Sequence, residues 1–139
     1  MSASNHSLSL ALQAAAVLQF VIALVNLGLE SILGWRAEMA QMPLLLREVH
    51  RVHSWFISVT VALFGLLTWR FAAELAAGGN PIGCWLVGGI AVFWGLRTVL
   101  QITYYSASHW RGKPGRTLLH LACLAAYGGL TLIYALAAR

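Results

Sequence analysis

Residues 82–105 read IGCWLVGGIAVFWGLRTVLQITYY, a run of 24 residues in which Arg97 carries the only formal charge. As a helix this run is about 36 Å long at about 1.5 Å per residue, enough to cross a hydrocarbon core of about 30 Å. Lipid offers no hydrogen-bond partners to the backbone, so a single segment that spans a membrane must be helical unless it belongs to a closed barrel. The stretch therefore predicts a transmembrane helix.

Three other apolar runs extend this prediction to the whole chain. They cover residues 8–35, 53–71 and 117–138. Turn-forming residues separate the runs: Pro43 in the first connector, GGNP at 78–81 and GKPG at 112–115. We predict an all-α polytopic membrane protein, an antiparallel bundle of four transmembrane helices in a single domain over residues 1–139, with little ordered structure beyond the four helices.

The composition excludes an ordinary soluble protein. Hydrophobic residues make up 60% of the chain, charged residues 9%, and the mean hydropathy is +0.75. A soluble domain carries about 25% charged residues. The net charge of +5 does not indicate a nucleic-acid partner, because the basic residues lie in short connectors and not on a face interleaved with exposed aromatic side chains.

The connector charges predict an orientation. One side of the membrane receives six basic residues, namely Arg36, Arg47, Arg51, Arg111, Lys113 and Arg116, and the other receives Arg70 and Arg139. The positive-inside rule then places both basic connectors in the cytoplasm and both termini outside. Residues 1–9 contain no Lys or Arg, so we expect the first helix to be retained and not cleaved as a signal peptide.

Cysteine and metal chemistry have little support. Cys84 and Cys123 fall at opposite membrane faces in this arrangement, beyond the reach of a disulfide, and no CxxC pair suggests zinc. Five histidines are too few to resemble the membrane hydroxylases and desaturases. We expect no metal site of these kinds.

Polar residues within the apolar runs mark the faces that the helices turn inward. Gln19, Asn26 and Glu30 are seven and four residues apart, and Arg97 and Gln101 are four apart, so each set lies on one side of a helix. Trp94 shares the face of Arg97, and the fourth run carries a heptad-like series of His120, Cys123, Tyr127, Thr131 and Tyr134. Since a central charge facing lipid costs about 2.5–3.5 kcal/mol, we expect these faces to meet. The predicted pocket lies near the cytoplasmic side and is lined by Glu30, His53, Arg97, Gln101, Tyr104 and His120.

Six residues are predicted to contact a ligand: Glu30, Asn26, Arg97, Gln101, Tyr104 and Tyr105. Glu30 and Arg97 are expected to pair, because an unpaired charge inside a span is costly. This pair has two interpretations, one that it only fixes the helix register and one that it serves a ligand. A guanidinium has five N–H donors, so Arg97 can hold one carboxylate and still donate to an anion or a quinone carbonyl.

His53 and His120 suggest a cofactor. Both begin apolar runs and lie on the polar faces. One imidazole from each of two adjacent helices is an arrangement that holds a b-type haem. We therefore consider these two histidines as haem ligands, with haem b as the candidate cofactor.

Several segments resemble a group of small uncharacterised four-helix bacterial integral membrane proteins. The resemblance rests on FWGLR at 93–97 with Gln101 and the Tyr104-Tyr105 pair, HWRG at 109–112 with His120 and Tyr134, and the first connector from Gly34 to His53. It implies four spans and a bacterial inner membrane. It implies no activity.

A weaker similarity is to the MAPEG family of glutathione-using membrane enzymes. Arg51-Val52-His53 is similar to the Arg-Ala-His that opens the second helix of that family, and Arg97 with Tyr104 or Tyr105 to the Arg and Tyr of its third. The family continues with Asn and Glu within the next turn, whereas this chain has SWFI at 54–57. Residues 54–57 therefore contain no counterpart of the Glu carboxylate that the resemblance implies for thiol chemistry.

These observations leave three classes of function. The first is a binding or accessory subunit whose pocket holds an amphipathic molecule such as a quinone, a lipid or haem. The second is a membrane enzyme acting on lipophilic substrates, either MAPEG-like or with His53 or His120 as general base. The third is a purely structural subunit of a larger membrane complex. The small-residue pairs Ala122/Ala126 and Ala125/Gly129 also suit a homo-oligomer, and membrane lipids are partners in every case.

Overall fold

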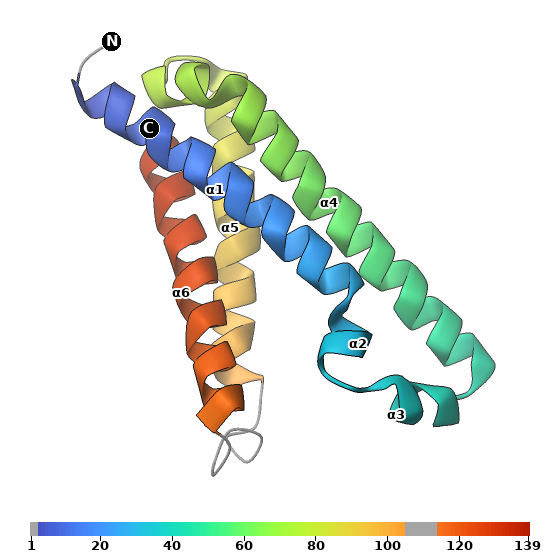
Figure 1. Cartoon of the computed structure of the whole chain (residues 1–139). Coiled ribbons are helices and arrows are strands. Elements are labelled where there is room, and N and C mark those ends of the chain that lie inside the picture. Colours follow the sequence, from blue (N-terminus) through green and yellow to red (C-terminus); the bar gives the residue numbers. More distant parts are fainter. Residues whose placement is uncertain (1–2, 105–113) are drawn as a thin grey trace. The chain divides into compact units, whose positions relative to one another are not determined.

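The computed structural model describes residues 3–104 and 114–139, and every regular element in them is an α-helix (Figure 1). The helices are α1 (Ala3–Leu27), α2 (Leu29–Ile32), α3 (Arg36–Gln41), α4 (Leu44–Ala77), α5 (Pro81–Thr103) and α6 (Pro114–Ala137). The helices α1, α4, α5 and α6 are long and apolar enough to cross a membrane. The predicted all-α class with four transmembrane helices is confirmed.

The ends of the first two long helices differ from the predicted runs. The first helix ends at Leu27, and Leu29–Ile32 form the separate short helix α2. Gly34, with φ of 71°, then adopts the left-handed conformation that glycine tolerates best. Outside the four spans, the described residues form two short helices, α2 with four residues and α3 with six.

Helix α4 is longer than a membrane span requires. Its 34 residues extend about 51 Å at about 1.5 Å per residue. It begins at Leu44, nine residues before the predicted start at His53, and continues to Ala77. One residue inside it, Phe71, has non-helical angles of φ −113° and ψ 18°, which kinks the helix.

The GGNP turn starts α5 as its residue types suggest. Gly78 and Gly79 have positive φ, and the Asn80 side chain accepts a 3.0 Å hydrogen bond from the backbone N–H of Ile82. Asn80 is thus the N-cap, followed by Pro81 in the first turn, where its missing N–H is not needed.

The chain forms two compact units. One is Ala14–Arg70, and the other combines the residues before Ala14 with those from Phe71 onward. The division at Arg70 coincides with the kink at Phe71. The single domain predicted over residues 1–139 stays a prediction.

In the unit Ala14–Arg70, α1 and α4 pack antiparallel. A Cβ added to Gly65 would lie 3.1 Å from the carbonyl oxygen of Ala16, so the backbones approach closely there. Further along, Asn26 hydrogen-bonds to Ser58. As the chain advances along α1 from residue 16 to 26, its partner on α4 moves back from 65 to 58. The antiparallel course follows.

In the other unit, α5 and α6 lie side by side and also run antiparallel (Figure 1). Gln101 contacts His120 near one end of the pair, and the thiol of Cys84 donates to the carbonyl of Arg139 at the other, at 3.2 Å. Between them the buried side chains include Val87, Ile90, Trp94, Leu130 and Tyr134.

The surface of the long helices is strongly apolar. Leu24, Phe56 and Trp85 are 69%, 71% and 83% exposed. Soluble monomers rarely expose contiguous apolar areas beyond a few hundred Å². Such side chains along helices of spanning length fit a lipid-facing surface.

Candidate functional site

A polar cluster joins α5 to α6. Arg97 Nη1 donates to Gln101 Oε1 at 3.0 Å, and Gln101 Nε2 lies 2.9 Å from His120 Nδ1. Gln101 is buried, at 4% exposed, while Arg97 and His120 are half-buried. Three residues predicted for the site are therefore brought together, and the four-residue spacing of Arg97 and Gln101 places both on one helix face.

The hydrogen bonds of the cluster have a defined direction. Arginine has only donors, so its partner on Gln101 must be the amide oxygen. The amide nitrogen then faces His120, and because it can only donate, Nδ1 of the imidazole must accept. A neutral His120 therefore carries its hydrogen on Nε2.

This direction gives the cluster an excess of donors. The guanidinium has five N–H groups, the amide two and the neutral imidazole one. The acceptors are the Gln101 oxygen and His120 Nδ1, and each already receives a hydrogen bond within the cluster. The polar groups of the cluster are therefore mostly hydrogen-bond donors.

Aromatic rings complete the surroundings of Arg97. Its Cζ lies 4.8 Å from the ring centroid of Tyr127, a cation–π distance. Tyr127 stacks on the buried Trp94 at 5.4 Å with an interplanar angle of 22°. The sequence placed both rings on polar helix faces but did not assign them to the site. The signal was available, because Trp94 lies one turn before Arg97 and Tyr127 two turns after His120.

The charge of Arg97 has no carboxylate counterpart on these two helices, since the sequences of α5 and α6 contain no Asp or Glu. The Gln101 oxygen and the Tyr127 ring, which contact the guanidinium, are neutral groups.

The sequence suggested that Glu30 lies within the first span, but the structure places it outside that span. It belongs to α2, beyond the end of α1 at Leu27. Its Oε1 is 3.9 Å from His50 Nε2, and the two side chains are 32% and 44% exposed. The argument that membrane burial forces Glu30 to pair with Arg97 is thus weakened. The two residues belong to different units, and their pairing stays a prediction.

Asn26 connects two helices. Its Nδ2 donates to the carbonyl oxygen of Ser54 at 3.0 Å and to Oγ of Ser58 at 2.8 Å. Ser58 Oγ in turn donates to the same Ser54 carbonyl at 2.9 Å. Both amide hydrogens are therefore used in packing α1 against α4, a role that the sequence analysis did not assign, although Ser54 and Ser58 lie one turn apart in an apolar run.

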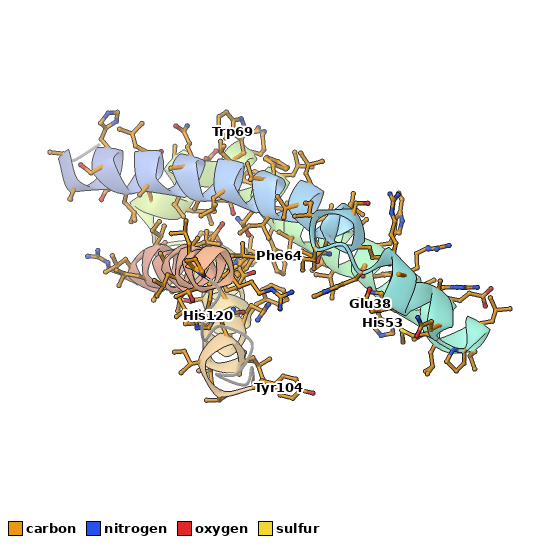
Figure 2. The ribbon with its side chains drawn as sticks, turned by 60° about the horizontal axis from the view of Figure 1, so that its bottom comes forward. Glu38, His53, Phe64, Trp69, Tyr104 and His120 are labelled. Atoms are coloured by element: carbon orange, nitrogen blue, oxygen red, sulfur yellow. The ribbon has the colours of Figure 1, made fainter. Side chains whose placement is uncertain are left out.

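The two histidines predicted as haem ligands differ in their hydrogen bonding. His53 lies exposed on α4 (Figure 2) and donates from Nδ1 to the carbonyl of Val49 at 3.0 Å, so a neutral ring has an unprotonated Nε2. Metal-ligating imidazoles normally donate from the nitrogen opposite the metal, so His53 fits this pattern. His120 does not, because its Nδ1 accepts and its Nε2 carries the proton. The two belong to different units, and haem ligation by both stays a prediction.

The tyrosines at the end of the third run are separate from the cluster. The side chain of Tyr104 is 80% exposed and extends from the end of α5, away from His120 (Figure 2). Its backbone N–H bonds to the Leu100 carbonyl at 3.0 Å. Tyr105 lies outside the described residues. Within the described part of the chain, no group of three His, Cys, Asp or Glu side chains is arranged to hold a metal ion.

Comparison with known proteins assigns no family. The resemblances to small four-helix bacterial membrane proteins and to the MAPEG family therefore stay predictions. No protein-family model, curated protein or solved structure matches this chain.

Proposed function

We propose that this chain is an integral membrane protein that binds an amphipathic molecule through an oxygen-bearing head group at the cluster of Arg97, Gln101 and His120. The observation that supports this most strongly is the direction of the hydrogen bonds, because Arg97 and the amide nitrogen of Gln101 both act as donors in the cluster. Quinone carbonyls and the carboxylate or phosphate oxygens of lipids are acceptors of the required kind. The protein would act as a binding or accessory subunit.

The apolar neighbours of the cluster suit the rest of such a molecule. Leu96, Leu100 and Leu121 adjoin the three polar residues in sequence and are 61%, 48% and 56% exposed. An acyl or isoprenoid chain lying along these leucines would replace membrane lipid, while the head group meets Arg97. A ligand with one polar end and one apolar end fits both parts.

Binding is favoured over base catalysis by the state of His120. In a neutral imidazole a general base must use the unprotonated nitrogen. That atom is Nδ1, and it already accepts from Gln101. Haem is less well supported than a quinone or a lipid for the related reason that Nε2 of His120 carries the proton.

The membrane and the orientation are part of the proposal. The excess of basic residues in the first and third connectors supports a cytoplasmic location for both, with the termini outside. The cluster would then lie toward the cytoplasmic side of a bacterial inner membrane.

The experiment is solvent extraction and mass spectrometry of the protein purified in a mild detergent. We compare the wild type with Arg97→Gln and use Arg116→Gln as the control, because Arg116 is exposed and outside the cluster. A charged hydrogen bond contributes about 1.5–3 kcal/mol, so the amount of ligand retained by Arg97→Gln should fall by roughly tenfold or more. The control should retain the wild-type amount.

Two results would contradict the proposal. One is equal retention of the same molecule by the wild type and a folded Arg97→Gln variant. The other is the absence of any stoichiometric molecule from the wild type, together with no thermal stabilisation by quinones or anionic lipids. Either result would favour a structural subunit.

A further inference from the structure

A pocket lies between the first connector and the start of α4, within the unit Ala14–Arg70. Its volume is about 350 Å³, at the lower end of the range for ligand sites. Its charged lining comes from Glu30, Arg36, Arg47, Glu48 and Arg51. None of these residues belongs to the cluster on α5 and α6.

The charges in this pocket are incompletely matched. The guanidinium groups of Arg47 and Arg51 form no hydrogen bond or ion pair with any residue that the structure describes. Arg36 donates from Nη2 to Ser31 Oγ at 2.7 Å. Arg47 and Arg51 are four residues apart on one face of α4, so their like charges repel each other unless an anion lies between them.

Phosphate is the anion best suited to these arginines. The planar guanidinium offers paired donors that match two phosphate oxygens, and such charge-assisted bonds are about twice as strong as neutral ones. Two arginines one helical turn apart can contact one phosphate group from the same helix face. A phosphate would also remove their mutual repulsion.

A carboxylate in the same pocket adds a second requirement. Glu48 lines the pocket, and within the part of the chain described its carboxylate has no ion-pair or hydrogen-bond partner. The Glu30 carboxylate, in contrast, is 3.9 Å from His50. A purely anionic ligand would leave Glu48 unmatched and would be repelled by it, whereas an ammonium group would pair with it. The pocket therefore suits a zwitterion.

The position of the pocket indicates that this zwitterion carries apolar chains. Leu44 lines the pocket and is 61% exposed, and the adjacent Leu45 and Leu46 are 70% and 53% exposed. The candidate span α1 ends at Leu27, shortly before the connector that contributes to the pocket. Charged groups beside exposed leucines at the end of a span match the headgroup region of a bilayer.

We propose that this pocket binds a phospholipid headgroup that combines a phosphate with a primary ammonium group. Arg47 and Arg51 hold the phosphate, and Glu48 accepts from the ammonium. The site is separate from the cluster of Arg97, Gln101 and His120, so the failure of one proposal leaves the other standing.

The test is native mass spectrometry of the detergent-purified protein titrated with lipids of identical acyl chains. The probes are phosphatidylethanolamine, phosphatidylglycerol and phosphatidylcholine, with free phosphoethanolamine as a competitor. We expect phosphatidylethanolamine to bind at least fivefold more tightly than the other two lipids, a difference of about 1 kcal/mol in binding free energy. Of the three headgroups, only this one combines the phosphate with an ammonium group that has N–H donors. Free phosphoethanolamine should compete only at far higher concentration.

Three variants assign the roles. The double variant Arg47→Gln/Arg51→Gln should weaken the binding of all three lipids at least tenfold. The variant Glu48→Gln should abolish the preference for phosphatidylethanolamine and leave the binding of phosphatidylglycerol unchanged or stronger. The control is Glu38→Gln, because Glu38 lies in the connector that contributes to the pocket but does not line the pocket. The substituted residues are exposed or half-exposed, and helical circular dichroism confirms that each variant is folded.

Three outcomes would overturn the inference. Equal or tighter binding of phosphatidylglycerol by the wild type would exclude the ammonium contact. Undiminished lipid binding by the double arginine variant would exclude the phosphate contact. Competition by free phosphoethanolamine at the lipid's own concentration would show that the ligand is a soluble phosphate ester and not a lipid.

Discussion

Replacing Gln101 with leucine should lower the stability of the protein more than any other single change in the cluster. The substitution keeps a side chain of similar size at this buried position but removes the bonds to both Arg97 and His120. In soluble proteins a bond to a charged group contributes about 1.5–3 kcal/mol and a neutral one about 0.5–1.5 kcal/mol. Membrane measurements are lower, about 0.6 kcal/mol on average and about 1.7 at most, because partners are also found in the unfolded state. Two bonds on the membrane scale amount to about 1–3 kcal/mol, and we expect a loss near 2 kcal/mol.

The assay is reversible unfolding in mixed detergent micelles followed by helical circular dichroism. Thr98→Val is the matched control, since Thr98 Oγ1 donates at 2.8 Å to the Trp94 carbonyl oxygen of its own helix. The control should lose less than about 0.5 kcal/mol. A loss for Gln101→Leu that equals the control would refute the claim that Gln101 connects the two helices energetically.

Three other predictions concern α1, α4 and the charges. Asn26→Leu removes two bonds to α4 and should lower the unfolding free energy by about 1–3 kcal/mol in the same assay; an unchanged midpoint would exclude this contact. Gly65→Val places a Cβ 3.1 Å from the Ala16 carbonyl and should cost about 1–3 kcal/mol through overpacking, and wild-type stability would show that the helices are not so close. If Glu30 and Arg97 pair, a double-mutant cycle with glutamine at both positions should give a coupling of at least about 1 kcal/mol, and additive losses would contradict the pair.

The number of transmembrane helices could be predicted from the sequence because hydropathy and length depend little on tertiary context. Their ends were less predictable. Leu29, Ile32, Leu33 and Trp35 continue the apolar composition beyond α1, so composition alone carried the first run to residue 35 although the long helix ends at Leu27. In α4 the polar residues before His53 concealed nine further helical residues, because helix formation does not require apolar side chains.

The site was predictable as far as helix periodicity reaches. Spacing placed Arg97 and Gln101 on one face and brought His120 to a similar level. It gave no information on which side chain bonds to which, so the cation–π contact with Tyr127 and the bonds of Asn26 to α4 were missed. The role assigned to Glu30 depended on its lying inside a span, an assumption that the end of α1 removes.

The direction of the hydrogen bonds at His120 is the basis of the donor-rich site, and nitrogen-15 NMR of the imidazole tests it most directly. The spectrum is recorded on protein labelled with nitrogen-15 at histidine, at a pH at which the imidazole is neutral. The signals of His120 are identified by their absence from the spectrum of His120→Gln. We predict a neutral ring with hydrogen on Nε2 and an unprotonated Nδ1 in the wild type. In Gln101→Glu, whose carboxylate can only accept, the hydrogen should move to Nδ1. A wild-type ring with its hydrogen on Nδ1 would contradict the assigned direction, and with it the argument that the site selects an acceptor oxygen.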